Sequence, residues 1–321
     1  MAGQDGKETM DRRQLLTAGV AVAAALTGVA VLETGAQESE RAPQAQPQGP
    51  APQPKQARLP VAYVPHGGGP WPFVDLPLGG KDELAALSAY LRNLPKLLPQ
   101  PPKALLVISA HWEEPQPTVM TSARPPMLYD YYGFPEEAYR VQWPAPGDPQ
   151  LAARVVQLLT AAGMRPATDA KRGFDHGTFV PLKVAWPGAE VPTVQLSLQR
   201  GLDPQVHLAM GRALAPLRSE GVFIIGSGMS YHNMRGFGDP RAKAASQAFD
   251  QWLKAAVTLA GPQRDAQLAQ WAQAPAARQV HPREEHLLPL MVIAGAADGD
   301  AGRVGYAGEL MGVAISAHHF G

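Results

Sequence analysis

Short apolar runs alternate with longer segments of helical spacing along most of this chain, and this alternation limits the folds it can adopt. The apolar runs, most of them rich in β-branched residues, lie at residues 61–65, 104–109, 192–197, 222–226 and 311–316. Helical periodicity covers residues 82–98, 149–163, 204–219, 241–260 and 285–297. Strands that alternate with helices form a sheet whose two faces the helices cover. The sequence therefore predicts an α/β fold with a central, mostly parallel or mixed sheet flanked by helices.

The N-terminal residues have the pattern of an export signal. Arg12 and Arg13 precede an uncharged apolar stretch at residues 15–32, and small residues follow at 34–36. This pattern resembles a twin-arginine signal peptide over residues 1–36, which predicts use of the twin-arginine export machinery and a periplasmic location. An apolar stretch of this length is also compatible with an N-terminal membrane anchor.

The remainder of the chain divides by composition into a linker and one predicted domain. Residues 37–60 are rich in Pro and Gln and contain few large apolar side chains, which predicts a disordered linker. Residues 61–321 are long enough for one well-buried core, and 45% of the chain is hydrophobic. We expect them to form a single catalytic domain.

Charge and cysteine content restrict the possible partners. The formal net charge is zero at pH 7, which gives no electrostatic reason to expect a nucleic acid or an anionic membrane surface. The chain contains no cysteine, so disulfides, thiolate ligands and a cysteine nucleophile are excluded. Any metal must therefore be held by His, Asp or Glu, and small neutral or weakly acidic substrates fit best.

Four histidines occur where an α/β sheet collects its ligands. His66, His111 and His232 each follow an apolar run, and His286 lies in an acidic turn. Ligands of such sheets gather beyond the carboxyl ends of the strands, and imidazole is the commonest metal ligand among side chains. The pattern predicts a metal site that includes His66 and His111.

Spacing alone leaves the third protein ligand open among Glu284, Glu285 and His286. Two histidines with one carboxylate are typical of non-haem iron(II) oxygenases, whereas three histidines also suit zinc. The two glutamates would alternatively supply favourable negative charge in the first turn of the helix predicted at 285–297.

The other histidines fall into two groups. His232 follows a strand in a glycine-bearing segment, a position typical of functional side chains, and imidazole is a suitable general acid or base. His176 lies in a turn-like segment, where it would either donate a hydrogen bond to a substrate or cap local structure. Four more are predicted to be structural or solvated: His207, His281, His318 and His319.

Seven segments, taken in order, resemble the class III extradiol ring-cleavage dioxygenases, and among them the DOPA 4,5-dioxygenase-like branch of the LigB superfamily. The resemblance spans roughly residues 60–320 and implies metal-dependent extradiol cleavage of a catechol-type ring with insertion of both atoms of O2. The segments lie at residues 66–70, 102–112, 130–147, 173–177, 192–197, 226–233 and 285–290.

The resemblance also implies a role for each histidine. It makes His66, His111 and His286 metal ligands, and it makes His232 the acid/base group, which can lie at coordinating distance when no substrate is bound. It places His176 in the substrate pocket. Glu285 becomes a residue that supports a ligand or replaces one. Iron(II) is expected for ring cleavage, and zinc(II) is a possible bound metal.

Two other functions fit part of the pattern. Memo-type proteins have a related fold without established ring cleavage, which would make this chain a non-catalytic metal-binding or interaction protein. A zinc-bound hydroxide would instead make it a hydrolase. Retention of all five histidines of the resemblance favours the dioxygenase.

Overall fold

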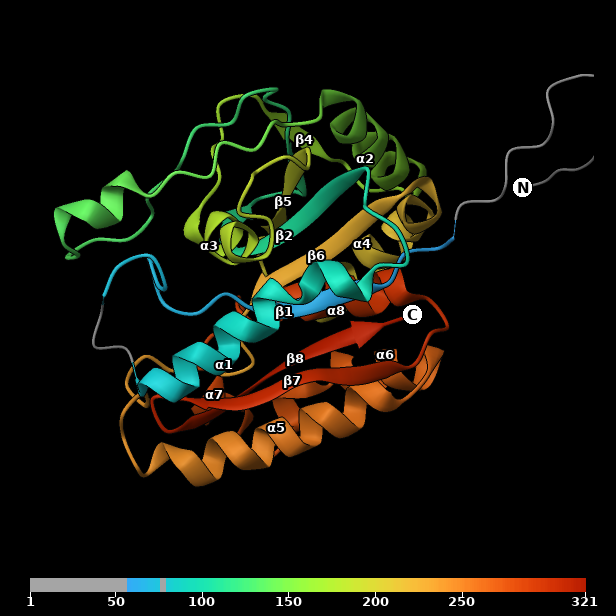
Figure 1. Cartoon of the computed structure of the whole chain (residues 1–321). Coiled ribbons are helices and arrows are strands. Elements are labelled where there is room, and N and C mark those ends of the chain that lie inside the picture. Colours follow the sequence, from blue (N-terminus) through green and yellow to red (C-terminus); the bar gives the residue numbers. More distant parts are fainter. Residues whose placement is uncertain (1–56, 76–78) are drawn as a thin grey trace, which may run out of the picture. The chain divides into compact units, whose positions relative to one another are not determined.

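The chain folds around one mixed β-sheet (Figure 1). This computed structural model describes residues 57–75 and 79–321. They form eight strands in the order β4-β3-β5-β2-β6-β1-β8-β7, which confirms the predicted α/β class. The strands are β1 Val61–Pro65, β2 Ala104–Glu114, β3 Thr118–Met120, β4 Ala167–Asp169, β5 Thr193–Gln199, β6 Val222–Gly228, β7 Gly302–Leu310 and β8 Val313–Phe320.

The central strands are parallel and buried on both faces. β6 pairs in parallel with β1 on one side and with β2 on the other, and β2 pairs in parallel with β5. Every residue of β1 and β6 is buried. Strands covered on both faces have continuous apolar runs instead of alternating patterns. This burial explains why the sequence displays such runs.

Helices cover both faces of this sheet. In β6, Gly226 and Gly228 face the segment of α8 and its N-terminal turn, whereas Ser227 between them donates a hydrogen bond to the carbonyl of Gly177 in α3. Successive strand residues point to opposite faces, so α3 and α8 lie on opposite sides. The helices are α1 Lys81–Arg92, α2 Pro149–Ala161, α3 His176–Ala185, α4 Pro204–Leu214, α5 Ala242–Thr258, α6 Gly261–Ala269, α7 Ala277–Val280 and α8 Leu288–Ala297.

The helix predicted at 285–297 begins three residues later. The carbonyl of Glu284 accepts hydrogen bonds from the amides of Leu287 at 2.8 Å and Leu288 at 3.1 Å, which closes a turn before α8. Glu284 and Glu285 therefore precede the helix and do not occupy its first turn. Within α8 every residue is buried, since the helix packs against both the sheet and α4.

The C-terminal strands also differ from the prediction. β8 begins at Val313 and not at residue 311, because Met311 and Gly312, with φ of 50° and 81°, form the turn that joins it to β7. Positive φ at both central residues characterises the type I′ hairpin turn. β7 was not predicted, because this strand at the sheet edge contains three glycines and is largely not buried.

The predicted signal peptide, the membrane anchor considered as its alternative, and most of the predicted linker lie outside the described residues. At the linker's C-terminal end, Leu59 is fully buried, and its amide donates a hydrogen bond to the carbonyl of Arg218 at 3.0 Å. The folded part thus includes Leu59, which the sequence pattern had placed in the linker. None of the helices in the described ranges has the length and apolar character needed to span a bilayer.

Candidate metal centre and its pocket

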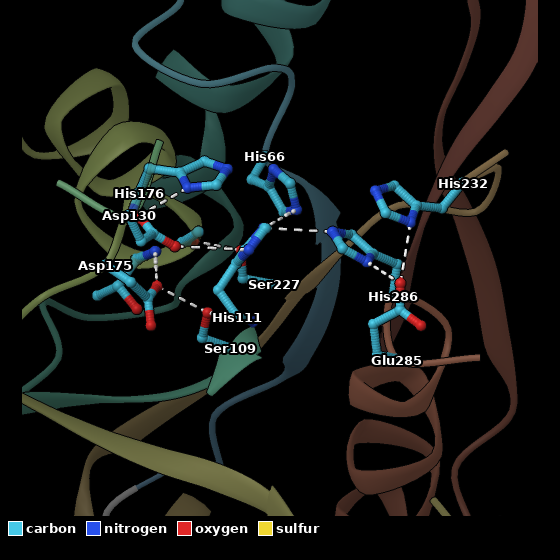
Figure 2. Close-up of polar contacts among 12 residues, drawn as sticks. His66, Ser109, His111, Asp130, Asp175, His176, Ser227, His232, Glu285 and His286 are labelled. Atoms are coloured by element: carbon cyan, nitrogen blue, oxygen red, sulfur yellow. Dashed lines mark hydrogen bonds and ion pairs between the residues drawn. The ribbon is translucent and has the colours of Figure 1, made fainter. Parts of the chain in front are cut away.

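Three of the predicted histidines meet beyond the central strands (Figure 2). Nε2 of His111 lies 3.3 Å from Nε2 of His66 and 3.2 Å from Nε2 of His286. One ligand atom from each residue lies within 4.8 Å of the other two, a spacing at which the three could hold one metal ion. His66 and His111, which were predicted to share a metal site, thus lie together, and His286 completes the group.

The backbone fixes each of these histidines. His66 follows β1, and its amide donates to the carbonyl of Gly228 at 3.2 Å. His111 lies within β2, at the register shift between Ile108 and Glu113, and not after the strand as predicted. The carbonyl of His286 accepts hydrogen bonds from the hydroxyl of Tyr63 at 2.7 Å and the amide of Met229 at 3.1 Å.

Close backbone approach explains the glycine that ends β6. A Cβ atom added to Gly228 would lie 2.1 Å from the carbonyl oxygen of His286. Only glycine therefore lets the His286 segment pack against the strand end.

Burial keeps the three imidazoles in the form that binds metals. The pKa values of His66, His111 and His286 lie well below the usual value, first because burial removes water from the charged ring and then because neighbouring histidines repel it. A neutral imidazole has a lone pair to offer a cation, and protonation removes it.

Two carboxylates each contact a pair of histidines. Oδ1 of Asp130 accepts from Nδ1 of His176 at 2.8 Å, and Oδ2 lies 3.5 Å from Nδ1 of His111. Oε1 of Glu285 lies 3.0 Å from Nδ1 of His286 and 3.0 Å from Nδ1 of His232 (Figure 2). We assign the ring proton to Nδ1 in these histidines, which leaves Nε2 with its lone pair.

Both carboxylates are ionised despite partial burial. Burial raises the pKa of Asp130, but the hydrogen bonds from His176 outweigh it and lower that pKa below its usual value. Burial likewise raises the pKa of Glu285, and the hydrogen bond from His232 outweighs it, so that this pKa is also lowered. Asp130 had no role in the sequence prediction. A carboxylate inside the aromatic segment at residues 129–134 was the available signal.

His232 lies beside the group of three and not within it. Its ring stacks on that of His286, with centroids 3.2 Å apart and planes inclined by 15°. The potential ligand group that includes His232 consists of His232, Glu285 and His286, separate from the group with His66 and His111. This placement suits a residue that acts next to the metal centre.

His176 is the first residue of α3, so the predicted turn-like segment was wrong. Asp175 caps this helix, and its carboxylate accepts from the amide of Thr178 at 3.1 Å. The centroid of the His176 ring lies 3.9 Å from that of His111 and 5.3 Å from that of His66. The helix start therefore places His176 against two of the three central histidines.

Asp175 also connects α3 to the strand that carries His111. Its fully buried carboxylate accepts from the Ser109 hydroxyl at 2.7 Å, from Arg172 at 2.7 Å and from the Gln195 amide. The Ser109 oxygen in turn accepts from the His111 amide at 3.2 Å. The sequence prediction gave Asp175 no role, although an Asp directly before a helix is a recognised capping signal.

We expect Asp175→Ala to lower the free energy of unfolding by about 3–5 kcal/mol, because it leaves Arg172, whose side chain is only 16% exposed, without its partner and removes the acceptor of the Ser109 hydroxyl and the Gln195 amide. Urea unfolding of the metal-free protein measures this change. Glu136→Ala is the control: it breaks an ion pair with Arg140 whose side chains are 80% and 70% exposed. Such an exposed pair contributes under about 1 kcal/mol. Equal losses in the two variants would contradict the role assigned to Asp175.

The remaining histidines are buried, so the solvated alternative for them was wrong. Nε2 of His207 accepts from the Gln199 amide at 3.2 Å, and Nε2 of His319 lies 2.7 Å from the Tyr90 hydroxyl. Burial lowers the pKa of His319 to about 4. Their positions fit a structural role. All four belong to the buried polar residues: His207, His281, His318 and His319.

A cavity of about 540 Å³ opens onto the histidines. His66, His111, His176, His232 and His286 all line it. The Gly67–Gly69 stretch also lines this cavity. Gly67 has φ of 80°, and a Cβ there would lie 2.5 Å from the ring of Trp71. Glycine at this position thus admits an aromatic wall beside the metal centre.

A histidine group at the carboxyl ends of the strands, open to an aromatic-lined cavity, defines a class of small-molecule enzymes that work at a metal centre. Residues 61–318 match the family described as the catalytic LigB subunit of aromatic ring-opening dioxygenase, and the chain belongs to this family. It is an aromatic ring-opening dioxygenase that acts on a small molecule and O2. The family is metal-dependent, and the histidine groups described above can hold an ion.

Individual relatives agree with this membership. The dioxygenase tasH of Hapsidospora irregularis is 38% identical over 280 residues, which cover 82% of this chain and 85% of that protein. The 4,5-DOPA dioxygenase extradiol of Beta vulgaris is 44% identical over 206 residues, which cover 63% of this chain and 76% of that protein. The protein of that name from Escherichia coli K12 is 35% identical over 250 residues, which cover 75% of this chain and 86% of that protein.

A solved structure has the same fold. The crystal structure of an uncharacterized protein from Escherichia coli K12 superposes with a TM-score of 0.67 at 30% identity, over 82% of this chain and 100% of that chain. The family match and the named relatives, and not this structure, favour the dioxygenase over the non-catalytic and hydrolase alternatives.

Proposed function

We propose that this enzyme holds iron(II) through His66, His111 and His286 and opens a catechol-type ring at the bond outside the diol. One observation carries the proposal: three Nε2 atoms converge at the wall of a cavity large enough for a substituted aromatic ring. The reaction breaks one ring carbon–carbon bond and incorporates both atoms of O2, so it needs no external reductant.

The donor set fits a divalent cation. Because Nδ1 of His111 and of His286 faces a carboxylate, the Nε2 atoms are acceptors only, and acceptors 3.2 Å apart repel each other unless a cation lies between them. Imidazole ligands without sulfur suit iron(II) and also zinc(II). When bound, iron would orient the catechol oxygens and O2 and allow electron density to pass between them.

His232 is the proposed acid/base group. Its Nδ1 donates to Glu285, which orients the ring and leaves Nε2 free to accept the proton of a catechol hydroxyl. The carboxylate then stabilises the imidazolium, as a third group does behind other catalytic bases. His232 returns the proton as the ring opens. Its stacking on His286 holds it beside the proposed metal position.

His176 is the proposed substrate-binding histidine. Oδ1 of Asp130 accepts hydrogen bonds from the backbone amide of His176 at 2.9 Å and from Nδ1 of the same residue at 2.8 Å. Nε2 of His176 therefore remains available inside the cavity. From there it can exchange a hydrogen bond with a substrate oxygen. Its position against His111 keeps it close to the reacting ring.

Anaerobic loading with iron(II), followed by addition of a catechol and O2, tests the proposal. A yellow ring-opened product should form with one O2 consumed per catechol. Zinc-loaded protein is the matched control and should bind catechol without turnover, since zinc has no redox chemistry. Absence of product from every catechol tested, with iron bound, would refute the proposal.

We also propose export through the twin-arginine pathway, on the basis of residues 1–36, which lie outside the described ranges. Replacing both Arg12 and Arg13 by Lys should leave the protein in the cytoplasm, because the export machinery recognises the arginine pair. Cell fractionation and immunoblotting measure the outcome. Arg41→Lys, in the predicted linker, is the control and should be exported normally. Unchanged periplasmic accumulation of the double variant would contradict the proposal.

A further inference from the structure

Aromatic and thioether side chains form most of the cavity wall apart from its histidines and glycines. Two aromatic rings, Tyr131 and Phe134, lie edge to face with centroids 5.3 Å apart. Met229 and Met311 add flexible apolar surface. The apolar side chains of the wall include Trp71, Tyr131, Phe134, Met229, Phe237 and Met311. A cavity of about 540 Å³ lies within the range that encloses ligands larger than a bare ring.

The same wall offers no positive charge. Among the described residues that line the cavity, none is a lysine or an arginine, and Asp130 supplies the one carboxylate. Both Asp130 oxygens already face histidine Nδ1 atoms. Apart from the proposed metal and the histidines beside it, a substrate carboxylate would therefore meet no cationic side chain, and a substrate ammonium would meet a carboxylate that is already paired.

The two arginines next to the site form ion pairs with carboxylates of the protein. Arg172 donates to His111 O at 3.3 Å but is paired with the buried Asp175 at 2.7 Å. Arg283 contacts Glu285 at 3.4 Å and also pairs with Glu113. Neither side chain lines the cavity.

Two cavity-lining residues extend the apolar wall to the protein surface. Tyr132 is 92% exposed and Met234 is 71% exposed, although both are large hydrophobic residues. Exposed apolar side chains grouped around a cavity are typical of a site that receives apolar ligands.

We infer that the preferred substrates are catechols with an uncharged, apolar ring substituent, and not catecholic acids or amino acids. The inference rests on the proposed ring cleavage, because it concerns the substrate of that same cavity. A charged substituent loses its water on entry and gains no partner of opposite charge, whereas an alkyl or aryl group gains contact with the apolar wall.

A series of catechols with the same three-carbon side chain tests the inference in the iron-loaded enzyme. The series contains 4-propylcatechol, 3-(3,4-dihydroxyphenyl)propanoate, 4-(3-aminopropyl)catechol and DOPA. We expect kcat/KM for 4-propylcatechol to exceed that of each charged compound by at least about tenfold. Equal or higher kcat/KM for any charged member would overturn the inference.

Binding measurements separate failure of this inference from failure of the proposed function. Calorimetric titration of the zinc-loaded protein with the same four compounds gives affinities without turnover. If no compound is cleaved, tighter binding of 4-propylcatechol still supports the inference while ring cleavage of catechols is rejected. If a charged compound binds as tightly, the inference fails whether or not cleavage occurs.

A charge placed on the wall supplies the converse test. Met234→Arg should raise the kcat/KM ratio of the propanoate to 4-propylcatechol by about fivefold, the factor for an ion pair near the surface. Gln116→Arg introduces the same charge in the connection between β2 and β3, outside this cavity. The control should leave the ratio unchanged. An unchanged ratio in Met234→Arg, or an equal rise in both variants, would overturn the assignment of this wall to the substituent.

Discussion

Replacing His111 with alanine should abolish stoichiometric metal binding. His111 is the member of the group whose Nε2 lies next to the Nε2 atoms of both His66 and His286. Its loss therefore removes the ligand that connects the other two. Elemental analysis after iron(II) or zinc(II) loading measures the metal per chain. Metal also stabilises a folded protein by about 2.7 kcal/mol at one hundred times its Kd, so the rise in melting temperature on metal addition should vanish in the variant.

Two histidine variants control this experiment. His176→Gln should keep its metal while its affinity for catechol falls, because His176 is assigned to the substrate. His319→Phe removes a buried histidine outside the cavity and preserves stacking on Tyr90, so it should bind metal as the wild type does. Full metal occupancy in His111→Ala would contradict the assigned ligand set, as would metal loss in His176→Gln.

Replacing His232 with alanine should reduce kcat for ring cleavage by about a hundredfold to ten-thousandfold, the usual contribution of a general acid or base. The variant should retain its metal, because His232 lies outside the group of three. Steady-state oxygen uptake by the iron-loaded variant measures the loss. Added imidazole should restore part of the rate, since a small base can enter the space left by the ring.

Glu285→Gln is the matched variant for His232→Ala. It keeps the shape of the side chain but removes the charge that supports the His232 imidazolium, so we expect a smaller loss of kcat and no rescue by imidazole. Near-normal turnover in His232→Ala would show that another group, such as His176, transfers the proton.

The fold class could be predicted because the central strands are buried on both faces. That environment demands continuous apolar runs, as in β1 and β6. The same kind of burial explains why α3 was not predicted as a helix. Nine of its ten residues are buried and it contains Pro181, so it has neither an amphipathic period nor a favourable composition.

The candidate site was predicted in part for a similar reason. His66 and His111 could be identified because their place near the strand ends follows from the local pattern. Asp130 and Asp175 act through contacts that no local pattern contains: Asp130 meets His176 across 46 residues, and Asp175 meets Ser109 across 66. Their partners are determined only when α3 packs against β2, so residue type and spacing could not reveal them.

The pairing of the first strand with the last sets the order in which this enzyme can be completed. β1, which precedes His66, is hydrogen-bonded to β8, with Val61 opposite Phe320 at the other end of the chain. During synthesis, β1 leaves the ribosome long before β8, its antiparallel partner. Contacts of such long sequence separation form slowly. The strand that positions His66 therefore reaches its native environment only after β8, a segment far along the sequence, has also folded.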